Sequence, residues 1–175
     1  MEVKVEKLTG EKVMREACSV TRHGKPSEVS LEEIYKSEHS PMRTQVFWVN
    51  LLGIYSFVST HIVRHNVGVE HFVSSLRDDT FGDGNEGRYT LVNHAMFVNA
   101  QALVNMARKR LCFKAHEETR KVFLNLKREI MDIDSPLSRF LVPECVYRGG
   151  ICPERKPCKI REDGGLAAIK RNTLG

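Results

Sequence analysis

The chain has 175 residues, of which 41% are hydrophobic and 28% are charged. This composition is typical of a globular protein, because a disordered chain has fewer apolar residues and a membrane span needs a long apolar run. The most apolar stretch, residues 46–63, is interrupted by several polar residues. Residues 1–6 alternate in charge and lack the apolar segment of a signal peptide. We therefore expect a cytoplasmic protein with no membrane partner.

The net charge of +5 is concentrated near the C-terminus, where the last 29 residues contain seven Lys or Arg and three Asp or Glu. A basic tail favours an anionic partner, although solvated surface lysines are the more common explanation. The chain also has five cysteines. In a reducing compartment these are expected to be buried thiols or metal ligands rather than disulfides.

The first third of the chain predicts short, alternating elements. Ser30 and Glu33 have the spacing of a capping box, which starts a helix. The residues after position 44 are rich in Val, Phe and Trp, which favours a buried strand. The expected elements are an edge strand at 3–8, a weak helix at 11–18, a helix from Ser30 to about Glu38, a strand at 44–52, and a helix at 54–63 that follows a turn at Gly53.

The remainder of the chain predicts mainly helices. An irregular or strand-like segment is expected at 71–76, a Gly-rich loop at 78–87, a central helix at 90–111, an amphipathic helix at 114–130 and a short helix starting at Ser135. Together these elements predict an α+β fold in which a small mixed sheet packs against a long central helix and further helices. Residues 1–142 are expected to form one domain, and residues 143–175 an irregular, basic tail.

Polar and ionisable side chains gather after the apolar helix at 54–63: His61, Arg64, His65, Glu70, His71, Ser74, Ser75 and Arg77. Arginine forks bind phosphates and the oxygens of planar rings, and hydroxyl groups can complete a phosphate site. Histidines can hydrogen-bond a ring or transfer a proton near neutral pH. The alternative is a capped helix end followed by a solvated loop.

A second polar group, Asn99, Asn105 and Arg110, falls on the expected central helix. Because side chains advance about 100° per residue, Asn99 and Arg110 should lie within roughly 20° of one another and Asn105 about 120° away. A buried, unpaired amide costs on the order of 1–3 kcal/mol, so these groups need partners. They are expected either to hydrogen-bond between helices or to contact a polar ligand from two sides.

In this order the two groups resemble the flavin-dependent thymidylate synthases, and in particular their short, phage-like forms. That family is marked by Arg-His-Arg, seven residues and then Ser, and here Arg64-His65-Asn66 is followed at the same spacing by Ser74. His39-Ser40-Pro41 stands where the family has a His-x-Thr/Ser-Pro element. The family's helix Asn-Ala-Arg-x-Leu-x-Asn corresponds to residues 99–105, with Gln101 at the arginine, and Arg110 follows.

The resemblance implies a fold, a reaction and a set of site residues. The reaction transfers a one-carbon unit from methylenetetrahydrofolate to C5 of dUMP, with FAD as the cofactor and NADPH as the reductant, in a homotetramer. The catalytic residues would be Arg64, His65 and Ser74. FAD would be bound by His39, Ser40, Arg64, His65, Asn66, Asn99 and Asn105. The nucleotide would be bound by His61, Ser74, Ser75, Arg77 and Arg110.

Two other functions remain open. The family's third motif arginine is Asn66 here, which leaves room for a related C5 modification such as hydroxymethylation. A non-enzymatic nucleic-acid-binding zinc protein is the other alternative, but a single Trp and the lack of a basic patch interleaved with aromatic residues argue against it.

The tail contains Cys145, Cys152 and Cys158, to which Cys112 could add a fourth thiolate, with His116 as the other candidate. Four such ligands would suit a structural zinc ion, although the close C-x₂-C pair that marks many zinc sites is absent. Ordinary buried thiols are the alternative.

Overall fold

The computed structural model describes residues 1–77 and 87–158. At its centre lies a four-stranded antiparallel sheet in the order β1-β2-β4-β3, with β1 at Glu2–Lys7, β2 at Val46–Tyr55, β3 at Val69–Val73 and β4 at Leu91–Asn99. The helices are α1 (Glu11–Thr21), α2 (Leu31–Ser37), η1 (Ser40–Thr44), α3 (Ser56–Ile62), α4 (Ala100–Arg110), α5 (Glu117–Ile133), α6 (Ser135–Phe140) and α7 (Glu144–Tyr147). The expected α+β class is confirmed, with antiparallel rather than mixed pairing between the described strands.

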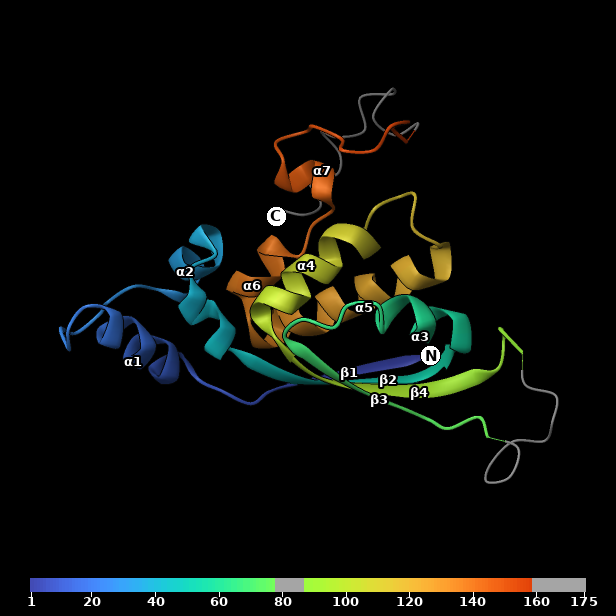
Figure 1. Ribbon diagram of the computed structural model, residues 1–175, viewed down its shortest axis with the longest axis horizontal. Coiled ribbons are helices and arrows are strands. Elements are labelled where there is room, and N and C mark those ends of the chain that lie inside the picture. Colours follow the sequence, from blue (N-terminus) through green and yellow to red (C-terminus); the bar gives the residue numbers. More distant parts are fainter. Residues whose placement is uncertain (78–86, 159–175) are drawn as a thin grey trace.

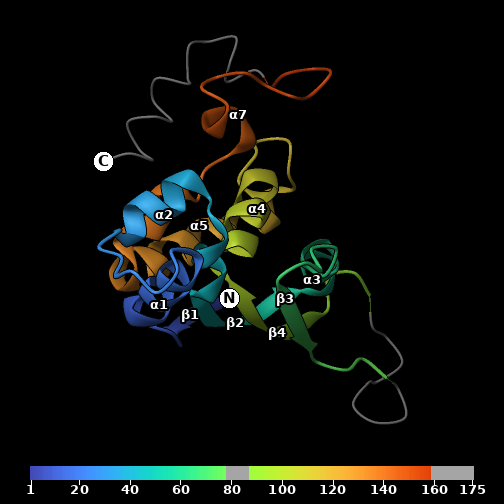
Figure 2. The same cartoon turned by 60° about the vertical axis from the view of Figure 1, so that its left-hand side comes forward.

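The core lies between one face of the sheet and the helices, which Figure 1 shows gathered on that side. Burial alternates along β2 and β4, as it does in a sheet with one covered face. The expected inner stripe of α5 is confirmed, since Val122, Phe123, Leu126 and Ile130 are all buried. Seen from another side in Figure 2, α4 and α5 lie above the strands, and α7 lies beyond the far end of α4.

The helix expected over residues 90–111 is wrong in its first half, which forms strand β4. Val92, Met96 and Val98 are buried at alternate positions, and the residue between them at the same spacing is the buried His94. A polar residue at a core position hid the period of two from the sequence analysis. Asn99 has extended backbone dihedrals and caps α4, because its Oδ1 accepts a hydrogen bond of 2.9 Å from the Ala102 amide.

This correction changes the geometry of the second polar group. Asn99 and Arg110 lie at opposite ends of α4, about 15 Å apart along the helix axis, and do not share one face of a continuous helix. The expected turn at Gly53 is also wrong. Strand β2 continues through Gly53 to Tyr55 with a bulge between Leu51 and Ile54, and Gly53 supplies the positive φ of 64°.

The other expected elements of the described residues are found. β1 is an edge strand, and α2 begins with the predicted capping box, in which Ser30 and Glu33 bond one another's backbone amides. α7 is a short helix that the sequence did not predict. The Gly-rich loop falls largely on residues 78–86, and the end of the tail on residues 159–175, both outside the described residues. No helix in the described ranges has the length and apolar character needed to cross a membrane.

Candidate functional site: an arginine-histidine corner

The first polar group and the C-terminal end of α4 meet in what we call the corner, formed by His61, Arg64, His65 and Arg110. Helix α3 ends at Ile62, so the following loop, residues 63–68, passes beside α4 before β3 begins. Arg110 Nε donates a hydrogen bond of 2.9 Å to His65 Nε2. A second nitrogen of the same guanidinium donates to the carbonyl oxygen of His61. The guanidinium of Arg110 is therefore held in place from two sides.

His65 is a neutral imidazole in this arrangement. Burial, together with the positive charge of Arg110, lowers the pKa of His65 to about 4. Because Nε2 accepts the hydrogen bond from Arg110, the single proton of the neutral ring lies on Nδ1. His65 can thus offer an N–H donor to a carbonyl oxygen or a ring nitrogen of a bound ligand.

The corner has positive charge that the protein does not neutralise. Burial lowers the pKa of Arg110, and the neighbouring charge of Arg64 adds to this effect. Arg64 is exposed to solvent. Within the described ranges, neither arginine forms an ion pair with a carboxylate. Two guanidinium groups beside a neutral imidazole form an environment that favours an anion such as a phosphate.

His61 forms another wall of the corner. Its Nδ1 is 2.9 Å from the hydroxyl of Thr119, a fully buried residue of α5. Burial lowers the pKa of His61, and the charges of Arg110 and Arg64 lower it further. The histidines of the corner are thus kept neutral by their surroundings, which leaves the two arginines as its charged groups.

A chain of hydrogen bonds supports the backbone of His65 from inside the fold. His71 Nε2 donates to the His65 carbonyl at 2.7 Å, His71 Nδ1 lies 2.9 Å from His94 Nε2, and His94 Nδ1 lies 2.9 Å from the Ser59 hydroxyl. The neutral ring of His94 donates to one of its two partners and accepts from the other, so it links Ser59 to His71. Burial lowers the pKa of His94 to about 4, which keeps that ring neutral.

The other end of the loop is fixed by Gly68 and Asn99. The backbone amide of Asn99 donates a hydrogen bond to the Gly68 carbonyl oxygen at 3.0 Å. Gly68 has a φ of +76°, and a Cβ atom there would lie 2.5 Å from Asn99 Nδ2. Only glycine fits this close approach. Asn99 therefore positions the loop and caps α4, and the expectation that it binds FAD directly stays a prediction.

Several predicted site residues lie away from the corner. Asn105 is exposed and accepts a 3.4 Å hydrogen bond from Arg108, whose guanidinium also pairs with Glu38. His39 and Ser40, the residues that follow Glu38, are exposed at the start of η1. Gln101, at the position of the family's arginine, donates to Glu38 at 2.9 Å. Hydrogen bonds and one ion pair thus hold Glu38, Gln101, Asn105 and Arg108 together, and in the described ranges none of these side chains bonds the side chains of the corner.

The serines after β3 also lie apart from the corner. The Ser74 hydroxyl accepts from the Asn93 amide at 3.1 Å and donates to the Asn93 carbonyl at 3.2 Å, so it extends the pairing of β3 with β4. Ser75 accepts a hydrogen bond from the Arg77 amide at 3.3 Å. Asn66 is exposed in the loop after His65. The predicted nucleotide-binding roles of these residues stay predictions.

Sequence reasoning missed His94, Ser59 and Thr119, which support the corner from the core. The signal for His94 was the alternation of Val92, His94, Met96 and Val98, which places the imidazole on the buried face of a strand. Ser59 and Thr119 gave no comparable signal, because single hydroxyl residues on helices are common and their partners lie 35 and 58 residues away.

The described architecture is the fold of the flavin-dependent thymidylate synthases. Thymidylate Synthase X (ThyX) from Helicobacter pylori, solved with FAD and dUMP, matches with a TM-score of 0.66 at 12% identity, over 81% of this chain and 99% of that chain. A UMP/dUMP methylase, PolB from Streptomyces cacaoi, bound with 5-Br dUMP, matches with a TM-score of 0.54 at 13% identity, over 79% and 94%. No protein-family model and no curated protein matches the sequence.

Proposed function

We propose that this chain binds dUMP and FAD at the corner and transfers a one-carbon unit from methylenetetrahydrofolate to C5 of dUMP, giving dTMP, with NADPH as the reductant. The observation that supports this most strongly is that Arg110, bonded to a neutral His65, and the neighbouring Arg64 have no carboxylate partner in the described residues. The solved structures of the same fold named above contain FAD with dUMP, or a brominated dUMP.

The donor set of the corner fits both ligands. Each ligand combines phosphate with a flat ring that has carbonyl oxygens, and the corner combines guanidinium groups with an imidazole N–H. Arg110 would bind the nucleotide, while Arg64 and His65 would lie against the flavin. When bound, FAD would supply the hydride chemistry, which no protein side chain provides.

The side chains of the corner would bind and orient the ligands without placing a third positive charge beside them. Arg110 is held by His61 and His65, so little side-chain freedom remains to be lost when it grips an anion. His65 stays neutral and can donate from Nδ1 to a ring oxygen without adding a third positive charge. The chain from Ser59 through His94 and His71 fixes the carbonyl of His65 and thereby the position of the loop.

A related C5 modification, such as hydroxymethylation, is the second candidate. The observation that favours it is Asn66, which is exposed beside the corner at the position where the family has its third motif arginine. An amide in place of a guanidinium removes one positive charge from the flavin side of the corner. This difference lies on the proposed flavin side of the corner and leaves the proposed nucleotide contact of Arg110 unchanged.

Two measurements test this function. The purified chain, supplied with FAD, should show a flavin absorption spectrum that changes on addition of dUMP. Incubation of that complex with dUMP, methylenetetrahydrofolate and NADPH should yield a nucleotide whose mass shows a methyl group in place of one hydrogen. An increase by one hydroxymethyl group would favour the second candidate. A chain that takes up no FAD, or whose flavin spectrum ignores dUMP, would contradict both candidates.

We also propose that the chain works as a homo-oligomer, a tetramer by analogy with the family. Arg64 and Asn66 are exposed, so the corner opens to solvent and a second copy could complete its walls. The outer face of the sheet has aromatic side chains, among them Phe72 and Phe97, which are 54% and 44% exposed, and Trp48, whose ring lies 5.5 Å from that of Phe72. Light scattering should give the mass of an oligomer, and Phe97→Glu should lower it.

A further inference from the structure

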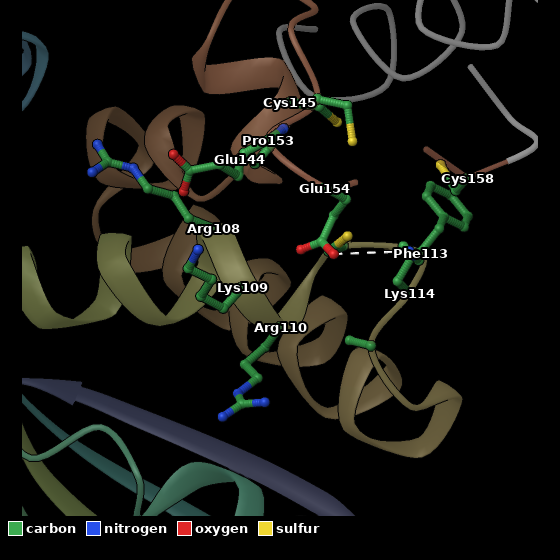
Figure 3. Close-up of a pocket in the computed structure, with 13 residues that line it drawn as sticks. Arg108, Lys109, Arg110, Phe113, Lys114, Glu144, Cys145, Pro153, Glu154 and Cys158 are labelled. Carbon is green, nitrogen blue, oxygen red and sulfur yellow. Dashed lines mark ion pairs between the residues drawn. The ribbon is translucent and has the colours of Figure 1, made fainter. Parts of the chain in front are cut away.

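The structure brings four cysteines from distant parts of the sequence to one cavity. Cys112 follows α4, while Cys145, Cys152 and Cys158 come from the segment after Pro143. All four line a cavity of about 390 Å³ at the C-terminal end of α4. Figure 3 shows Cys145 and Cys158 on two sides of this space, with the ion pair of Lys114 and Glu154 below them in the view. Arg110 also lines this cavity, but its side chain points away from the thiols and bonds His65 in the corner.

We propose that these four cysteines, Cys112, Cys145, Cys152 and Cys158, bind a structural zinc ion that fastens the segment 144–158 to α4. This inference does not depend on the proposed reaction. Four thiolates in a tetrahedron are a common structural zinc site, with Zn–S distances of about 2.3 Å. His116, the other candidate ligand from the sequence, instead packs its ring against Phe57 at 4.6 Å.

The first argument is the burial pattern of the segment. None of residues 144–158 is buried. Among residues 151–158, Cys152 and Cys158 are partly buried and the other six are exposed. In residues 151–158 the cysteines are thus the points at which the chain turns toward the rest of the molecule. A segment without apolar side chains in the core needs another source of order, and a metal ion bound by its inward-facing thiols supplies it.

The second argument is the path of the backbone. Gly149 and Gly150 both have positive φ, of 64° and 105°, and the Gly150 amide donates to the Cys145 carbonyl at 2.7 Å. This turn reverses the chain after α7, so Cys152 returns to the same cavity as Cys145. Most other residue types disfavour two successive left-handed conformations. The turn therefore brings Cys145 and Cys152 to the same cavity, as a shorter spacing brings two cysteines together in other zinc sites.

The third argument is electrostatic. A zinc ion with four thiolates has a net charge of −2, which is costly unless cations lie nearby. Basic residues outnumber acidic ones in the lining: Lys109, Arg110 and Lys114, with Arg108 already paired with Glu38, lie against Glu144 and Glu154. Lys114 also donates to the carbonyl of Lys156 at 2.7 Å and lies 3.8 Å from Glu154, which draws the segment toward the loop after α4. The surroundings thus favour a negatively charged metal centre.

The thiols must move inward to close such a site. In the described residues no group of three or more His, Cys, Asp or Glu side chains is arranged to hold a metal ion as it stands. The segment has few packed side chains to resist this movement, since none of residues 144–158 is buried. Binding would release the thiol protons, so zinc affinity should fall at acidic pH.

Elemental analysis of the full-length chain, purified under reducing conditions without chelator, tests the proposal. We expect about one zinc ion per chain, as in other closed four-thiolate sites. Cys145→Ser and Cys152→Ser should each lower the zinc content at least several-fold. Cys18→Ala is the matched control, because Cys18 is buried in α1, contacts Met14 and lines no part of the cavity, so its zinc content should match that of the wild type.

A second measurement on the wild-type chain keeps the test independent of how the variants fold. Replacing the metal by Co²⁺ should give sulfur-to-cobalt charge-transfer absorption and the visible bands of a tetrahedral site. A metal-free chain would overturn the proposal, as would iron in place of zinc, or disulfides among the four cysteines after reducing purification. Unchanged zinc content in the two serine variants would overturn the ligand assignment. None of these outcomes affects flavin binding, so this test is separate from that of the proposed reaction.

Discussion

Arg108 and Arg110 lie two residues apart on α4 and have opposite surroundings. Arg108 pairs with the carboxylate of Glu38, and its guanidinium lies 3.5 Å from the ring centre of Tyr147. Arg110 instead bonds a neutral imidazole and a carbonyl group, near a second arginine. The protein satisfies the charge of Arg108 internally and leaves that of Arg110 uncompensated. The comparison indicates that Arg108 serves stability and that Arg110 serves a ligand.

Glu38 makes the contrast sharper. Burial alone would raise the pKa of Glu38, but hydrogen bonds from Arg108 and Gln101 outweigh burial, and the pKa lies below its usual value. Glu38 is thus an ionised partner for Arg108. Among the described residues no carboxylate plays this role at the corner.

The largest expected effect separates the two arginines by nucleotide binding. Arg110→Met should weaken dUMP binding by roughly 10- to 150-fold, because a hydrogen bond to a charged group contributes about 1.5–3 kcal/mol. Arg108→Met, the matched control, should change the affinity by less than about two-fold, since the charge of Arg108 is compensated by Glu38. Calorimetric titration of both variants measures the difference. Equal losses in the two variants would remove the distinction on which the comparison is based.

The next effect reverses the order of the two variants. Arg108→Met should lower the free energy of unfolding by about 1–3 kcal/mol, because the partly buried Glu38 then has no cationic partner. Urea denaturation measures this loss. Adding Glu38→Gln to Arg108→Met should recover part of it, as expected for two residues in direct contact. Purely additive effects would show that the ion pair contributes nothing of its own.

The acid sensitivity of the fold should reflect the neutral histidines behind the corner. The pKa values of His65 and His94 are about 4 in the folded chain, against about 6.5 in an unfolded chain. Between these values the unfolded chain binds more protons than the folded chain. The free energy of unfolding therefore has its full value above about pH 6.5 and falls as the pH decreases toward 4. Denaturant unfolding at a series of pH values tests this.

A pair of variants assigns that pH dependence to its source. His94→Gln should flatten the decline, because the buried group that resists protonation is gone. The exposed His23, changed to Asn, which also tolerates its positive φ of 56°, should leave the decline unchanged. A stability that stays constant from pH 6.5 to 4 in the wild type would show that these rings are not held neutral.

The smallest effect concerns Arg64. Its side chain is exposed, so Arg64→Gln should weaken dUMP or FAD binding by only a few-fold, and added salt should reduce the difference, because exposed charges are screened within about 8–10 Å. The effect of Arg110→Met should depend less on salt, since Arg110 is partly buried. Titrations at low and high ionic strength measure both, and the same salt dependence for the two would show that Arg110 acts as a surface charge.

The sequence predicted the corner better than it predicted the elements that build it. His65 and Arg110 were singled out by residue type and spacing, and the structure joins them by a hydrogen bond across 45 residues. The strand β4 was missed because His94 occupies a core position and interrupts the apolar alternation. A buried histidine is read as a polar position when only the sequence is seen, because its partners, Ser59 and His71, are brought to it by the fold.

The pairing of Arg108 with Glu38 could not be predicted for the same reason. Arg108, Lys109 and Arg110 form one basic run, and nothing local distinguishes them. The helix turns each side chain to a different side, and Glu38 lies 70 residues from Arg108. Side-chain direction on a helix follows from position, but the partner in that direction depends on tertiary structure.

A crystal structure of the chain with FAD and dUMP tests the central claim most directly. We expect a phosphate or ring oxygen of a bound ligand within hydrogen-bonding distance of the Arg110 guanidinium, with His65 Nδ1 facing the ligand and Arg108 still paired with Glu38. Both ligands bound elsewhere, with Arg110 contacting only the groups of His61 and His65 that it bonds now, would contradict the account.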